Sequence, residues 1–109
     1  MAQSFQPPAI SSETRAAALE KAFVARRARA EVKAALKEGR QSLGEVLDAA
    51  EGDPHLTKMK VKDLLRSLPG VGDRRAETIM EEIGIAESRR LGGLGVHQRS
   101  ALLERFAPQ

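Results

Sequence analysis

The residues best placed to do chemistry in this chain are five consecutive ones, Leu68-Pro69-Gly70-Val71-Gly72. Apolar patterns typical of amphipathic helices flank them on both sides. Pro69 predicts the end of the first helix, and Gly70 permits a backbone conformation that side chains disfavour. Val71 is an apolar plug between the helices, and Gly72 leaves the first N–H groups of the next helix uncovered. Such unpaired N–H groups, at the positive end of a helix dipole, favour a bound anion over a purely structural tight turn.

Basic side chains surround this turn. Arg74 and Arg75 fall in the first turn of the following helix, where they oppose the helix dipole, so their presence indicates that an anion binds there. The turn resembles the h-P-G-h-G signature of helix-hairpin-helix modules, which bind DNA without sequence specificity. A nucleotide-binding P-loop is excluded, because it needs a preceding strand and a Gly-Lys-Ser/Thr ending. The residues expected to contact a phosphate backbone here are Lys58, Lys60, Ser67, Leu68, Pro69, Gly70, Val71, Gly72, Arg74 and Arg75.

A second basic cluster follows the next helix, where two adjacent arginines, Arg89 and Arg90, stand beside three glycines. Arginines on a short loop can hydrogen-bond phosphates or enter a minor groove. The alternative is that one of them caps a helix carbonyl, which would be the better interpretation for a single arginine. The pair favours contact with nucleic acid. The residues expected to make that contact are Ser88, Arg89, Arg90, Gly92, Gly93, Leu94 and Gly95.

The net charge of +3 is unevenly distributed along the 109 residues. Residues 1–57 are balanced, with eight basic and eight acidic side chains, whereas residues 58–109 hold ten basic and seven acidic ones. The densest stretches are 58–75, with six basic against two acidic residues, and 21–37, with six against one. Positive patches of this size favour an anionic polymer or surface, the alternative being a solvated surface of uneven charge.

The residue types and their spacing give little indication of a catalytic site. His55 and His97 are isolated, and no nucleophile stands beside an obvious base. Glu81 and Glu82 are adjacent on a predicted helix and therefore point apart. There is no cysteine, and no His/Asp/Glu spacing indicates a metal site. We expect a protein that is not an enzyme and needs neither metal nor cofactor.

The first residues show no signal peptide, and no apolar run is long enough to span a membrane. Residues 1–11, with a Pro-Pro pair, are predicted to form a flexible arm and residues 12–109 a single helical domain. Residues 12–38 lack Gly and Pro, are rich in Ala, Arg, Lys and Glu, and predict one long helix that stops at Gly39. The sequence favours a cytoplasmic protein.

Short amphipathic helices are expected in a body over residues 42–106. Ser42 and Glu45 have the spacing of a capping box. Helical apolar spacing follows at 43–50, 61–68 and 76–83, and a last helix of about ten residues is expected near the C-terminus. No stretch alternates as a strand does. The expected fold is therefore all-α, with a long N-terminal helix packed on a compact bundle of short helices.

The second half of the long helix is predicted to present a basic face. Its side chains Arg26, Arg27, Arg29 and Lys33 form a candidate second contact, either with the same duplex or with another one. A solvated alanine-rich connector is the alternative. A coiled coil is not indicated, since no a/d heptad is sustained.

Together these segments resemble the actinobacterial, or mycobacterial-type, integration host factor family. The resemblance covers about residues 12–106. The segments that carry it are RAAALEKA at 15–22, ARRARAE at 25–31, KMKV at 58–61, LPGVG at 68–72 and RRLGGLG at 89–95. One departure is Gly92, where family members commonly have a third basic residue. Arg99 is a candidate to supply that contact.

The resemblance implies a monomeric nucleoid-associated protein with a long N-terminal helix and a helix-two-turn-helix body. It implies binding of double-stranded DNA without marked sequence preference, DNA bending and compaction, effects on supercoiling, and a host-factor role in phage site-specific recombination. The expected partners are thus duplex DNA and a phage integrase–DNA assembly, with no membrane. In the family the turn and the arginine loop contact DNA, and these roles carry over to Pro69, Gly70, Val71, Gly72, Arg89 and Arg90.

Two alternatives from other classes remain at this stage. The same hairpin occurs in ribosomal small-subunit proteins that bind RNA, although those usually carry a long basic tail and this chain ends Ala107-Pro108-Gln109. The second alternative is a protein-interaction module whose long helix binds a partner protein.

Overall fold

The computed structural model describes residues 12–107, which fold into helices joined by short turns. Within these residues the extended pairing is limited to one isolated β-bridge, so the predicted all-α class is confirmed. The expected arm at 1–11 lies outside the described residues. The elements in chain order are α1 (Ser12–Lys37), α2 (Leu43–Ala50), α3 (Pro54–Thr57), α4 (Val61–Arg66), α5 (Asp73–Ile83), the 3-10 helix η1 (Leu91–Gly93) and α6 (Val96–Arg105).

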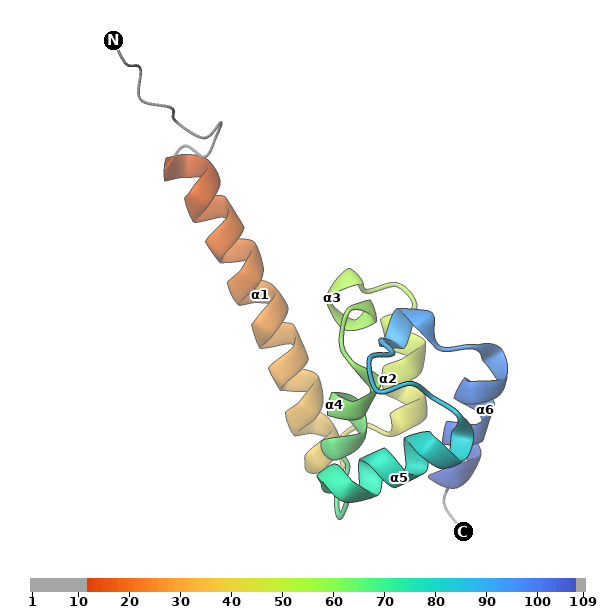
Figure 1. The fold of residues 1–109 in the computed structure, drawn as a ribbon. Coiled ribbons are helices and arrows are strands. Elements are labelled where there is room, and N and C mark those ends of the chain that lie inside the picture. The colour runs from red at the N-terminus through yellow and green to blue at the C-terminus, as the bar shows by residue number, and fades with distance from the viewer. Residues whose placement is uncertain (1–11, 108–109) are drawn as a thin grey trace.

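The long helix α1 is a rod that touches the body with its C-terminal part while its N-terminal half projects away (Figure 1). Within α1, Ala35 and Leu36 are buried, whereas Leu19 and Phe23 are 64% and 56% exposed. Gly39, with φ 75°, ends the helix as predicted. The predicted packing of the long helix on the body is confirmed, and its two buried residues lie near its C-terminal end. The short helices bury their apolar faces mainly against one another, and α1 also contacts α3, where Arg29 Nη1 donates to the His55 carbonyl at 3.5 Å.

The region between α2 and α4 holds an element that was not predicted. The capping box of α2 is present, with the Glu45 N–H donating to Ser42 Oγ at 3.1 Å and the Ser42 N–H to Glu45 Oε1 at 2.9 Å. The Asp53-Pro54 pair that follows α2 starts α3. Asp53 Oδ1 accepts from the His55 N–H at 2.9 Å, and proline is favoured at the first helical position. The 3-10 helix η1 was also missed.

The hydrophobic core lies inside the body. The predicted faces of α4 and α5 meet there, with Leu64, Leu65 and Ala76 fully buried and Ile79 and Met80 nearly so. The structure ends α4 at Arg66, so Leu68 lies beyond the helix and packs partly buried against the core. Leu102 of α6 and Leu36 of α1 complete the core. This packing fixes α4 and α5 against one another, and with them the turn that joins them.

Candidate nucleic-acid interface

The turn between α4 and α5 has the geometry that its sequence predicts. Gly70 has a φ of 78°, in the left-handed region that disfavours side chains. The Val71 N–H donates to the Leu68 carbonyl at 3.1 Å, and the Val71 side chain is 7% exposed within the core. The Ser67 hydroxyl donates to the Asp63 carbonyl at 2.9 Å. The side chains of Val71 and Ser67 therefore shape the turn, and its exposed surface consists of Pro69, Gly70 and Gly72.

The start of α5 leaves its first amides without a side-chain cap. Gly72 is the N-cap residue in extended conformation, and within residues 12–107 no side chain caps this end. The first backbone hydrogen bond of the helix runs from the Ala76 N–H to the Gly72 carbonyl at 3.0 Å. The amides of the preceding residues point out of the helix end, where Arg74 and Arg75 are both exposed. The turn thus offers N–H groups and two cations on one exposed surface.

The arginine loop is tethered to the segment that precedes α4. Lys60 and Arg90 face one another in the antiparallel β-bridge. The Val61 N–H donates to the Arg89 carbonyl at 2.9 Å, and the Leu91 N–H donates to the Met59 carbonyl at 2.9 Å. Backbone pairing therefore places the two predicted clusters next to one another, although they are far apart in the sequence.

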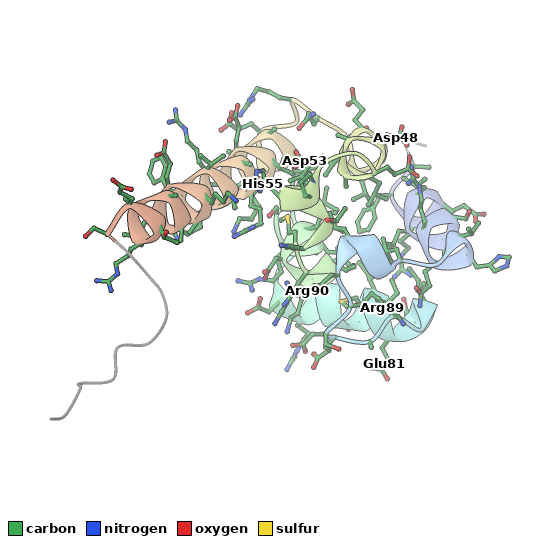
Figure 2. The ribbon with its side chains drawn as sticks, turned by 90° about the horizontal axis from the view of Figure 1, so that it is seen from above. Asp48, Asp53, His55, Glu81, Arg89 and Arg90 are labelled. Carbon is green, nitrogen blue, oxygen red and sulfur yellow. The ribbon has the colours of Figure 1, made fainter. Side chains whose placement is uncertain are left out.

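Both arginines of the loop, which are labelled in Figure 2, also donate hydrogen bonds to backbone carbonyls. Arg89 Nη1 donates to the Gly93 carbonyl at 2.8 Å, and Arg90 Nη1 donates to the Lys58 carbonyl. The alternative interpretation, carbonyl capping, therefore describes both side chains in this structure. A guanidinium carries five N–H donors, so each arginine keeps donors for a phosphate.

The rest of the loop is shaped mainly by packing. A Cβ on Gly92 would meet the Thr57 carbonyl oxygen at 3.2 Å, and a Cβ on Gly93 would meet Arg89 Cδ at 3.2 Å. Leu94 packs partly buried against the core, and the Gly95 N–H donates to Gln98 Oε1 at 3.0 Å. Close packing therefore explains these residues without a ligand, and Ser88 is exposed. Their contact with DNA stays a prediction.

A basic cleft lies between α1 and the body, with a volume of about 620 Å³. Seven of its ten lining residues are basic and two are acidic. Part of its lining comes from the arginine loop and from the segment before α4, and part from α1. A strongly positive concave surface of this kind concentrates anions. The basic residues that line it are Arg29, Lys33, Lys58, Lys60, Lys62, Arg66 and Arg90.

Of the four basic residues of α1 that were predicted to form a second contact, two line the cleft and two do not. Arg29 and Lys33 line it, and Arg29 Nη1 also donates to the His55 carbonyl at 3.5 Å. Arg26 and Arg27 are exposed on α1 and do not line the cleft. Arg29 and Lys33, from the predicted second contact, therefore lie in the same cleft as Lys58, Lys60 and Arg90, from the predicted first contact.

Lys62 and Arg66 line the cleft and were missing from the residues expected to contact phosphate. Their spacing of four places them on one face of α4, a signal that was available in the sequence. Both are paired with carboxylates. Lys62 Nζ lies 2.8 Å from Glu77 Oε1 and 3.7 Å from Glu87 Oε1. The hydrogen bond between Lys62 and Glu77 lowers the pKa of the Glu77 carboxyl below its usual 4.5 and raises the pKa of Lys62 above 10.5.

Sequence comparison places this arrangement in a known group. Residues 36–106 match the S13-like H2TH domain family. Over 99 residues the chain is 58% identical to the integration host factor of Mycobacterium tuberculosis, covering 91% of this chain and 94% of that protein. It is 54% identical to the integration host factor of Streptomyces coelicolor, covering 91% of this chain and 92% of that one. The chain belongs to the integration host factor family. The resemblance drawn from the turn and the arginine loop is confirmed.

A solved structure of a protein with the same architecture supports the integration host factor fold. The structure of sIHF bound to an 8-bp palindromic DNA matches with a TM-score of 0.79 and 52% sequence identity. The match covers 81% of this chain and 99% of that chain. The expected helix-two-turn-helix body is thus confirmed by both the family match and the fold.

Arg99, the candidate for the basic contact that Gly92 cannot make, is paired with carboxylates in this structure. It forms ion pairs with two carboxylates of the α2 region, Asp48 and Glu51, the latter at 3.2 Å. Its guanidinium is engaged there, and it lies outside the residues that line the basic cleft. Whether Arg99 supplies a phosphate contact stays a prediction.

Two further findings concern residues 12–107. No group of three or more His, Cys, Asp or Glu side chains in that range could hold a metal ion. No helix in that range combines the length and the apolar character needed to cross a bilayer.

Proposed function

We propose that this protein is a nucleoid-associated protein that binds double-stranded DNA through its phosphate backbone. The observation that carries the proposal is the basic cleft, which joins the segment before α4, the arginine loop and α1 in one surface. The uncapped start of α5 adds N–H donors near that surface. The solved relative, sIHF, is bound to an 8-bp palindromic DNA, which supports the same class of ligand here.

Binding is largely independent of sequence in this proposal. Reading bases in the major groove requires side chains such as Asn, Gln or Arg on a helix that enters the groove. The exposed polar side chains of α5 include three glutamates, Glu77, Glu81 and Glu82, rather than a row of Asn, Gln or Arg. The basic groups instead suit phosphates, which every sequence presents equally.

The architectural role is a further part of the proposal. A protein bends a duplex when it holds it at two places, and the turn and the basic side chains of α1 provide two such places. We infer that the protein bends and compacts DNA and alters supercoiling. It acts as a monomer in the cytoplasmic nucleoid, without catalysis, and as a host factor for a phage integrase–DNA assembly in site-specific recombination. The family relationship supports this role.

The test is binding to several unrelated duplexes over a range of salt concentrations, measured by gel shift or fluorescence anisotropy. If about four to six phosphates are neutralised, log K falls against log[salt] with a slope of roughly −4 to −5. All duplexes are expected to bind with similar affinity. A flat salt dependence, or one strongly preferred site in a selection from random sequences, contradicts the proposal.

Structured RNA is a second candidate ligand, because a cleft lined by cations attracts any phosphate backbone. Competition between duplex DNA and a structured RNA distinguishes the two. The proposal requires that an excess of RNA displaces DNA poorly.

A further inference from the structure

Arg66 connects the cleft with the turn. Its side chain lines the cleft, and its Nε lies 2.6 Å from Asp73 Oδ1, across the turn that separates α4 from α5. Its Nη1 lies 3.4 Å from Asp63 Oδ1. Two carboxylates therefore hold one guanidinium where the basic cleft meets the exposed amides of α5. The Arg66 side chain is still 47% exposed, so a ligand can reach it.

Asp73 is a negatively charged residue within a mainly basic surface. It follows Gly72 directly as the first residue of α5, and its side chain is 67% exposed. The helix dipole favours a carboxylate at this position. The same carboxylate repels a phosphate that approaches the turn, because like charges a few ångströms apart repel even near a surface. Asp73 thus stabilises the free protein and disfavours a bound anion.

We propose that Arg66 is a phosphate-binding residue of this surface and that Asp73 lowers the affinity for DNA by holding Arg66 and by repelling phosphate. The inference rests on the proposed DNA-binding function. When a phosphate arrives, it takes the place of the Asp73 carboxylate on the guanidinium of Arg66, and Asp73 turns to solvent. Arginine suits this exchange, because its planar fork binds carboxylate and phosphate in the same way.

The experiment compares Asp73→Asn with a matched control, Glu82→Gln. Glu82 lies on the same helix and pairs with Arg105 at 2.7 Å, with similar exposure, but away from the turn and the cleft. Binding of an unrelated duplex is measured by fluorescence anisotropy at several salt concentrations, and thermal unfolding verifies that each variant is folded. We expect Asp73→Asn to bind about three- to tenfold more tightly than the wild type. Glu82→Gln is expected to change affinity by less than about twofold.

Arg66 variants test the other half of the inference. Arg66→Ala is expected to bind about tenfold more weakly, with a salt slope shallower by about one. In the double variant Arg66→Ala/Asp73→Asn, the gain from Asp73→Asn shrinks, because part of it acts through Arg66. Arg66→Gln replaces Arg66→Ala if the latter does not fold.

The outcomes separate the inference from the proposed function. Folded Asp73→Asn that binds as the wild type does, or more weakly, overturns the role of Asp73. An unchanged salt slope in the Arg66 variants overturns the role of Arg66. Wild-type protein that binds no duplex at low salt contradicts the proposed function itself.

Discussion

Lys60 and Arg90 face one another in an antiparallel β-bridge, so the segment before α4 and the arginine loop form one piece of backbone structure. The hydrogen bonds on either side of the bridge, both 2.9 Å, link Val61 with Arg89 and Leu91 with Met59. Arg90 adds a side-chain hydrogen bond to the Lys58 carbonyl. The backbone that carries the cations of these two segments is thus held in place, which lowers the entropy that a ligand must remove on binding.

The two arginines of the loop are expected to respond differently to truncation. Arg90 lines the cleft, so Arg90→Ala should weaken duplex binding about tenfold and make the salt slope shallower by about one. Arg89 is half-buried and bonded to the Gly93 carbonyl, so Arg89→Ala should also lower the melting temperature. Anisotropy and thermal unfolding measure both effects. Arg40→Ala, which removes an exposed ion pair with Glu38, is the control. Equal binding by Arg90→Ala and the control contradicts the prediction.

Substitutions at two glycines of the turn, Gly70 and Gly72, are expected to have different effects on the stability of the fold and on the affinity for DNA. Gly70→Ala places a side chain at a φ of 78° and is expected to destabilise the fold by about 1–2 kcal/mol. Gly72 is extended, and a Cβ there meets nothing within 4 Å. Gly72→Ser should add an N-cap to α5, raise stability by a few tenths of a kcal/mol, and weaken DNA binding because the hydroxyl occupies an amide. Denaturant unfolding and anisotropy test the pair. Tighter binding by Gly72→Ser would show that the α5 amides are not used.

Charge reversals on α1 should fall into two groups. Arg29 and Lys33 line the cleft, so Arg29→Glu/Lys33→Glu is expected to weaken binding of a short duplex. Arg26 and Arg27 do not line it, so Arg26→Glu/Arg27→Glu should impair bending or bridging more than simple binding. Anisotropy reports affinity, and the rate of DNA ring closure reports bending. If both pairs lose binding and bending to the same extent, the division by the cleft is incorrect.

Stability should depend on the ion pair between Lys62 and Glu77 in acid. The folded protein lowers the pKa of Glu77 below 4.5, so the unfolded chain takes up the proton first. The contribution is complete above pH 4.5 and is lost as the pH falls through the lower, folded-state pKa. Thermal unfolding between about pH 3 and pH 6 should show this loss, and Glu77→Gln should reduce it. Glu81→Gln, on the same helix, should keep the acid dependence of the wild type.

The attachment of α1 should depend on its last turns. Leu36 is 1% exposed, so Leu36→Ala is expected to destabilise the protein by about 2–5 kcal/mol. Phe23 is 56% exposed on the projecting half, and Phe23→Ala should change stability by less than about 0.5 kcal/mol. Urea unfolding measures both. A large loss of stability in Phe23→Ala would mean that a partner covers this part of α1 in solution.

Local spacing in the sequence determined the helices, their caps and the turn. The capping box of α2, the stop at Gly39 and the positive φ of Gly70 depend on residues a few positions apart. Such short-range hydrogen bonds and backbone preferences depend only on the types and the spacing of neighbouring residues, so they can be predicted from the sequence. The short helix α3 was missed because its four residues are too few to show a helical apolar period.

Only the tertiary structure decided which cations lie together in one cleft. The cleft joins Arg29 of α1, Lys60 before α4 and Arg90 of the loop, which pack or bond over long sequence distances. It also separated Arg99, which pairs with Asp48 and Glu51, from the cleft lining. A sequence shows which residues are charged, but the packing of the helices decides toward which surface each charged side chain points. The turn alone therefore predicted a phosphate site, and the folded chain made it one end of a wider basic surface.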